Sequence, residues 1–86
     1  MVNQQDNHYR TSDTALAAFL RTQNFFLVTI DYTKLRFEFV FNDSENLREA
    51  VNNYITGNAL CDPSAFARVN RKLNRIIRKQ VQWEED

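Results

Sequence analysis

Hydrophobic side chains are densest between residues 25 and 41, FFLVTIDYTKLRFEFVF, a stretch that holds five of the seven phenylalanines. Apolar and polar positions alternate there with a period of two, which predicts two β-strands joined by a tight turn near Thr33 and Lys34. The turn lacks the Asn-Gly or Asp-Gly pair of a type I′ hairpin. The sequence pattern therefore defines the strand pairing better than it defines the turn type. Because a two-stranded ribbon is unstable alone in water, we expect helices on its apolar face.

The register of this hairpin follows from placing the aromatic residues on one face. Pairing Ile30 with Phe37 achieves this, since side chains alternate across the pleat. The same register sets Asp31 opposite Arg36, and opposite charges that face each other across two strands are favourable. The cross-strand pairs predicted for the apolar face are Tyr32–Leu35, Ile30–Phe37, Val28–Phe39 and Phe26–Phe41.

A short strand and a helix are predicted before the hairpin. Residues 8–11, HYRT, fit a third strand at the hairpin edge with Tyr9 turned inward. Either Ser12 or Asp13 supplies the N-cap of a helix that runs to about Gln23. Asn24 tolerates the left-handed backbone conformation that ends a helix. The apolar face of this helix consists of Leu16, Phe19 and Leu20.

Two further helices are predicted after the hairpin. Residues 42–44, NDS, are all N-cap types, so the second helix starts at one of them, and the only glycine, Gly57, closes it. Asp62 and Pro63 form a strong start signal for the third, which extends to about Gln82. The apolar stripes of the two helices are Leu47, Ala50, Val51 and Tyr54, then Phe66, Val69, Leu73, Ile76 and Ile77, with Trp83 as a candidate at the end.

The predicted architecture is therefore a single α+β domain over residues 8–83. An antiparallel β-hairpin, with a short third N-terminal strand, is packed on one face by three helices in the order β-α-β-β-α-α. A chain of 86 residues is long enough for one such domain with a modest core. Residues 1–7 are expected to be a disordered tail, and residues 84–86 an acidic tail.

A set of cap, turn and core positions forms a recognisable pattern: Tyr9, Thr11, Asp13, Ala17-Ala18-Phe19-Leu20, Phe37, Phe39, Phe41, Leu47, Tyr54, Gly57, Ala59-Leu60, Asp62-Pro63, Phe66, Leu73 and Ile77. With this pattern the chain resembles a small, uncharacterised prokaryotic domain family of unknown function. The resemblance covers roughly Tyr9 to Arg78 and implies the same β-α-β-β-α-α fold. It implies no catalytic or binding residue, because the matching positions are caps, turns and core. One departure is Asn24, where such sequences often have glycine.

The composition argues against most enzyme chemistry. The chain has one histidine, one cysteine and one glycine, too few for a zinc site or a glycine-rich phosphate loop. Cys61 is expected to be a small buried thiol rather than the partner of His8 in a nucleophilic pair. The carboxylates that begin helices are explained as caps. We therefore expect no catalytic residue, no cofactor, no metal and no small-molecule substrate.

The sequence also predicts a soluble, cytoplasmic protein. A lone cysteine cannot form an internal disulfide, which fits a reducing compartment. No apolar run approaches the length needed to span a bilayer, so no membrane contact is expected. The formal net charge is zero.

Two surfaces are candidates for binding. The second face of the hairpin carries Phe25, Leu27 and Val40, and either another segment of the chain covers this patch or it binds a partner protein or a second copy. The predicted last helix carries a basic stripe opposite its apolar side, which is either an ordinary solvated face or a nucleic-acid contact surface. The stripe consists of Arg68, Arg71, Lys72, Arg75, Arg78 and Lys79.

The balance of these features favours a non-enzymatic binding or adaptor domain that acts through protein–protein contact. Nucleic-acid binding through the basic stripe is the alternative. A neutral chain with a pI of about 6.6 counts against it, since nucleic-acid-binding domains are usually strongly basic.

Overall fold

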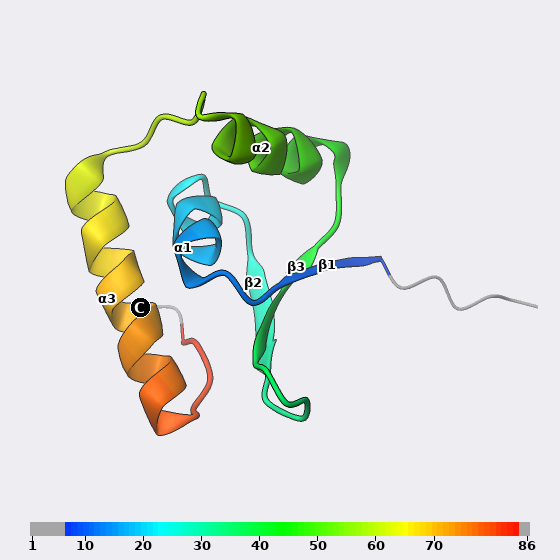
Figure 1. The fold of residues 1–86 in the computed structure, drawn as a ribbon, viewed down its shortest axis with the longest axis vertical. Coiled ribbons are helices and arrows are strands. Elements are labelled where there is room, and N and C mark those ends of the chain that lie inside the picture. The colour runs from blue at the N-terminus through cyan, green and yellow to red at the C-terminus, as the bar shows by residue number, and fades with distance from the viewer. Residues whose placement is uncertain (1–6, 85–86) are drawn as a thin grey trace, which may run out of the picture.

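The phenylalanine-rich stretch forms the two long strands of a three-stranded antiparallel sheet, and the expected order β-α-β-β-α-α is confirmed (Figure 1). The computed structural model describes residues 7–84, so the two expected tails lie outside the described residues except for Asn7 and Glu84. The elements are β1 (His8–Thr11), α1 (Thr14–Thr22), β2 (Leu27–Asp31), β3 (Glu38–Asn42), α2 (Glu45–Thr56) and α3 (Pro63–Lys79).

Strand β3 is the centre of the sheet, whose order is β1-β3-β2. Both neighbours pair with it antiparallel, so its backbone groups are satisfied on both sides. Phe39, Val40 and Phe41 are all buried, although successive side chains point to opposite faces. Strand β3 is therefore buried on both faces.

The predicted hairpin register is wrong by two residues. Ile30 pairs with Phe39 instead of Phe37, and Asp31 faces Glu38 instead of Arg36. The side chain of Asp31 accepts hydrogen bonds from the backbone N–H and the hydroxyl of Thr33, a local turn that ends β2 and lengthens the connection.

A bulge between Leu27 and Thr29 also changes which side chains of β2 are buried. The bulge breaks the strict alternation, so Leu27 and Ile30 are both buried. Phe26, Val28 and Leu35, which were expected on the apolar face, are exposed. Simple alternation could not anticipate this because it assumes a regular ladder.

Side-chain caps begin each helix at the places where the sequence predicts them. The carboxylates of Asp13 and Asp62 accept the backbone N–H groups of Leu16 and Ala65, which settles the first helix start in favour of Asp13. The hydroxyl of Ser44 accepts the backbone N–H of Leu47 at 3.0 Å, so Ser44 is the residue of the NDS triplet that caps α2. These bonds satisfy backbone donors that have no partner within a helix.

Left-handed residues end the helices. Asn24, just after α1, has φ 71°, and Gly57, after α2, has φ 84°, both as expected. Helix α3 ends at Lys79, three residues before the predicted end, because Gln80 adopts φ 56° and turns the chain back.

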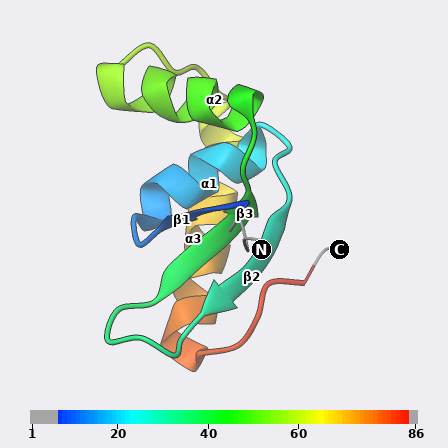
Figure 2. The same cartoon turned by 90° about the vertical axis from the view of Figure 1, so that its right-hand side faces the viewer.

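The helices cover one face of the sheet, and α1 lies between the sheet and α3 (Figures 1 and 2). Ala17 and Ala18 are fully buried and let the neighbouring elements approach α1 closely. Helix α2 lies across one end of this stack. The core that holds the layers together consists of Leu16, Ala17, Ala18, Phe19, Leu20, Leu27, Ile30, Phe39, Phe41, Leu47, Val51, Leu73 and Ile76.

After α3 the chain runs back beside β2 as a segment that we call the C-terminal strap, residues 80–84 (Figure 2). The side-chain amide of Gln82 accepts the N–H of Ile30 and donates to its carbonyl, both at 2.8 Å. The hydroxyl of Tyr32 donates to the carbonyl of Val81 at 2.6 Å. A side-chain amide thus takes the place of a neighbouring strand at the β2 edge, which protects part of it from foreign strands.

Replacing Gln82 with alanine should lower the free energy of unfolding by about 1–2 kcal/mol, because two hydrogen bonds to Ile30 are lost. Urea unfolding measures the loss, and amide hydrogen exchange should show faster exchange at Ile30. The control is Asn52→Ala, which removes an exposed amide from α2. Unchanged exchange at Ile30 in Gln82→Ala would contradict this role for the strap.

Gly57→Ala should destabilise the protein by about 1 kcal/mol, because the left-handed backbone is strained for any residue with a Cβ. A Cβ built at this position has nothing within 4 Å, so no clash adds to that cost. Asn24→Gly, at the other positive-φ helix end, should change stability by only a few tenths of a kcal/mol. Thermal or urea unfolding of the two variants checks the difference; equal effects would contradict it.

Candidate functional site

The patch predicted for protein contact, Phe25, Leu27 and Val40, is not an exposed surface. Leu27 and Val40 are only 2% exposed, and Phe25 is half-buried. The bulge turns Leu27 into the core, and Val40 lies between its strand partners Arg10 and Thr29. The expectation that these residues form an exposed patch is therefore wrong for Leu27 and Val40, which the folded chain itself buries, while Phe25 keeps part of its surface.

An ion-pair cluster occupies the outer side of the sheet near the patch. The observed register sets two acids, Asp31 and Glu38, opposite each other. Arg10 of β1 reaches both, at 3.2 Å and 3.3 Å, and Lys34 is 3.2 Å from Glu38. Hydrogen bonds from Thr33, and then from Arg10, hold the pKa of Asp31 below its usual value. The cluster stabilises an unfavourable pair of like charges and has a structural role.

The other carboxylates with known partners also have structural roles. Asp13 and Asp62 are helix caps. Asp43 pairs with Arg48 at 2.6 Å, and this hydrogen-bonded arginine lowers the pKa of Asp43. No group of three or more His, Cys, Asp and Glu residues that could hold a metal ion occurs within residues 7–84. None of the helices in that range has the length and apolar character needed to cross a membrane.

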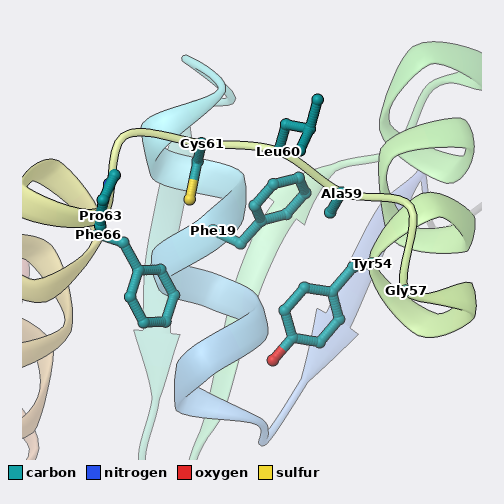
Figure 3. A pocket seen from close by; sticks show the side chains of 8 residues that line it. All are labelled: Phe19, Tyr54, Gly57, Ala59, Leu60, Cys61, Pro63 and Phe66. Atoms are coloured by element: carbon teal, nitrogen blue, oxygen red, sulfur yellow. The ribbon is translucent and has the colours of Figure 1, made fainter.

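An apolar groove opens where the segment between α2 and α3 crosses the end of α1 (Figure 3). Its volume is about 440 Å³. The ring centres of Phe19 and Tyr54 lie 5.5 Å apart. We call this feature the apolar groove; its lining consists of Phe19, Tyr54, Gly57, Ala59, Leu60, Cys61, Pro63 and Phe66.

Local hydrogen bonds position the segment that borders the groove. The left-handed turn at Gly57 lets the N–H of Asn58 bond to the carbonyl of Asn53 at 2.8 Å. The amide of Gln23, at the end of α1, donates to the carbonyl of Leu60 at 3.4 Å. The groove border is therefore tied to both α1 and α2.

The side chains of the bordering segment point in different directions. Figure 3 shows the thiol of Cys61 directed toward the space between Phe19 and Phe66, whereas Leu60 points away from it. Cys61 is exposed, so the expectation of a buried thiol is wrong. It precedes the N-cap of α3 and lies outside the apolar stripe of any helix, so no element buries it.

The polar character of the groove is slight. Tyr54 contributes a hydroxyl, and burial, with a smaller effect from Asp13, raises the pKa of this phenol above its usual value. The hydroxyl is therefore protonated at neutral pH and able to donate a hydrogen bond. The sequence analysis missed the groove because three helices and a link build it together. The one available signal was Ala59-Leu60, a pair of apolar residues outside every periodic stripe.

The basic stripe predicted on the last helix lies on the outer side of α3. Its six residues do not form one uniform set, because Lys72 is half-buried, donates to the Glu84 carbonyl at 3.1 Å and lies 4.3 Å from the centre of the Trp83 ring. The other five are exposed, and none makes an ion pair within the described part of the chain. We call these five the basic face: Arg68, Arg71, Arg75, Arg78 and Lys79.

Stability should fall on acidification because of the outer-sheet cluster. The carboxyl of Asp31 has a lower pKa in the folded protein than the ordinary value of 3.8. Its contribution is therefore fully present above about pH 4 and is lost as the pH falls through the folded pKa. Asp31→Asn should reduce this acid-dependent loss, as measured by urea unfolding between neutral pH and strongly acidic pH.

The control for this experiment is Glu49→Gln, which removes an exposed carboxylate on α2 far from the cluster in sequence. This variant should keep the wild-type dependence on pH. An equally steep loss of stability in Asp31→Asn and in the wild type would show that the cluster is not responsible.

Comparison with known proteins gives one match. A protein-family model described as a domain of unknown function (DUF5659) matches residues 6–79, from β1 to the end of α3. No curated protein matches the chain, and no solved structure matches it. The match thus covers the groove and the basic face, and supplies no activity for either.

Proposed function

The chain belongs to the DUF5659 family, a domain of unknown function, and from its geometry we propose a small non-enzymatic binding domain that contacts a partner protein through the apolar groove. The observation that carries this proposal is an open hollow of about 440 Å³ with a mostly apolar lining. Such a space accepts one or two large apolar side chains of a partner.

The chemistry of the lining favours a protein over a small molecule. Sites for small molecules usually combine apolar walls with several placed polar groups that fix the orientation of the ligand. Here Tyr54 and Cys61 are the only lining residues with polar side-chain atoms. Aliphatic or aromatic side chains on a partner need no such groups, and interface anchors are commonly of this kind.

Exposed apolar side chains extend the surface beyond the groove itself. Leu60, which lines the groove, is 88% exposed, and Ile55, next to Tyr54 in the chain, is 71% exposed. Contiguous exposed apolar area is typical of protein interaction sites, because burying it against a partner removes it from water. The groove and the Leu60 side chain would form one contact surface, and Ile55 adds exposed apolar area on α2.

The proposal of a non-enzymatic role rests on the tasks that the carboxylates already have. Caps and ion pairs account for Asp13, Asp31, Glu38, Asp43 and Asp62. We further propose a prokaryotic, cytoplasmic protein. The proposal of a prokaryotic source rests on the resemblance of the sequence to a prokaryotic domain family, and an exposed free thiol at Cys61 is compatible with a reducing compartment.

Selection of peptides from a displayed random library tests the proposed function. Selected peptides should carry a large apolar anchor residue. Cys61→Phe directs a large side chain into the groove from an exposed position, so it should weaken binding about tenfold or more without disturbing the core. Leu60→Glu should weaken binding by removing exposed apolar area.

The matched control is Leu35→Glu, since Leu35 is a leucine at least as exposed as Leu60 and lies in the hairpin connection, away from the groove lining. Leu35→Glu should leave peptide affinity unchanged. Peptides that bind Cys61→Phe as tightly as the wild type, or a selection that yields only peptides without an apolar anchor, would overturn the proposal.

A further inference from the structure

The basic face of α3 is separate from the apolar groove and points to a second binding function. We propose that Arg68, Arg71, Arg75, Arg78 and Lys79 bind the phosphate backbone of duplex DNA. The inference does not depend on the groove, because none of these five residues lines it.

Charge is strongly segregated in this neutral chain. Helix α3 carries six of the eleven Lys and Arg residues, and no acidic residue occurs between Asp62 and Glu84. The remainder of the chain therefore carries five basic residues against eleven acidic ones. A net charge of zero conceals a helix with a strongly positive outer side, and such a local field attracts a polyanion.

The partners of the other charges reinforce this contrast. Within residues 7–84, the acids Asp31, Glu38 and Asp43 form ion pairs with basic residues that lie outside α3. These basic residues are Arg10, Lys34 and Arg48. None of these pairs involves the basic face. Its five cations are available to an external anion, and four of them are guanidinium groups, which bind phosphate oxygens through two hydrogen bonds at once.

The geometry of α3 suits a long, regular ligand. From Arg68 to Lys79 the helix rises by about 16 Å, at 1.5 Å per residue. Spacings of three and four residues keep the side chains on one side of the helix. Figure 1 shows α3 at the outside of the molecule, with no described helix or strand covering the side that faces away from α1. A duplex could therefore approach along the helix.

The aromatic residues argue for a duplex rather than a single strand. Proteins that bind single strands usually stack the bases on exposed aromatic rings. Trp83, in the C-terminal strap, is half-buried with Arg21 and Lys72 against its ring, at 5.1 Å and 4.3 Å from its centre. Its ring is therefore already engaged by two cations of the chain. Contacts to phosphates alone fit a double helix.

The choice of DNA over RNA follows from groove shape. The major groove of B-form DNA, about 12 Å wide, admits an α-helix, whereas that of A-form RNA is deep and narrow. The proposed contacts are to phosphates, which carry no sequence information, so the binding should show little sequence preference. We therefore expect similar affinity for unrelated duplexes.

Fluorescence anisotropy with a labelled DNA duplex of about 20 base pairs tests this inference across roughly 50–200 mM salt. Five phosphate contacts predict that log K falls with log salt at a slope of about −4 to −5. Arg71→Gln/Arg75→Gln/Arg78→Gln should reduce the slope to about −2 and the affinity on the order of 100-fold near 100 mM salt. Glutamine matches arginine in helix propensity, so α3 should still form, as circular dichroism would verify.

The matched control is Lys34→Gln/Arg36→Gln/Arg48→Gln, which removes the same number of positive charges from the hairpin connection and α2. The DNA affinity of this control should stay within about twofold, because none of the three charges lies on α3. The control should still fold, because exposed ion pairs contribute little to stability. Cys61→Phe should also bind DNA normally, which separates this test from that of the groove.

Three results would overturn the inference. The first is an absence of DNA binding even at the lowest salt concentration, or DNA binding whose affinity does not fall as salt is added. The second is an equal loss of affinity in the α3 variant and the control variant, which would indicate dependence on net charge alone. The third is equal affinity for duplex RNA, which would contradict the docking of α3 to a DNA groove.

Discussion

The fold depends on the burial of β3 on both faces and along both edges. Phe39 and Phe41 anchor the core, while Val40 fills the opposite side of the sheet. A strand in this position must have a neighbour on each side, because an unpaired buried backbone group is costly. The short β1 meets this requirement on one side and brings Arg10 to the acids of the outer face.

Strand β2 pairs with the other side of β3 and is itself an edge strand of the sheet. The edge is not left bare, since the amide of Gln82 bonds to both backbone groups of Ile30. This places the end of α3 next to the sheet and brings Trp83 against Arg21 and Lys72. One consequence of a central β3 is therefore that Lys72 is engaged with the strap instead of standing with the basic face.

Features encoded by a few neighbouring residues were predictable from sequence, whereas features that several elements decide together were not. The caps at Asp13 and Asp62 and the left-handed Gly57 depend on local chemistry, and they lie where the sequence predicts them. The hairpin register was wrong because a bulge and the Asp31 turn shift it, and neither has a strong sequence signal. For the same reason the basic face, carried by one helix, was predictable in its outline, while the groove, built by three helices and a link, was not.

The position of the only tryptophan determines what the protein's intrinsic fluorescence can report. Trp83 belongs to the strap, and its indole lies against two cationic side chains. Emission therefore follows the attachment of the strap first, whereas circular dichroism follows the three helices. Unfolding curves from the two signals coincide only when strap and core form one cooperative unit. This single residue makes the cooperativity of the domain measurable without any label.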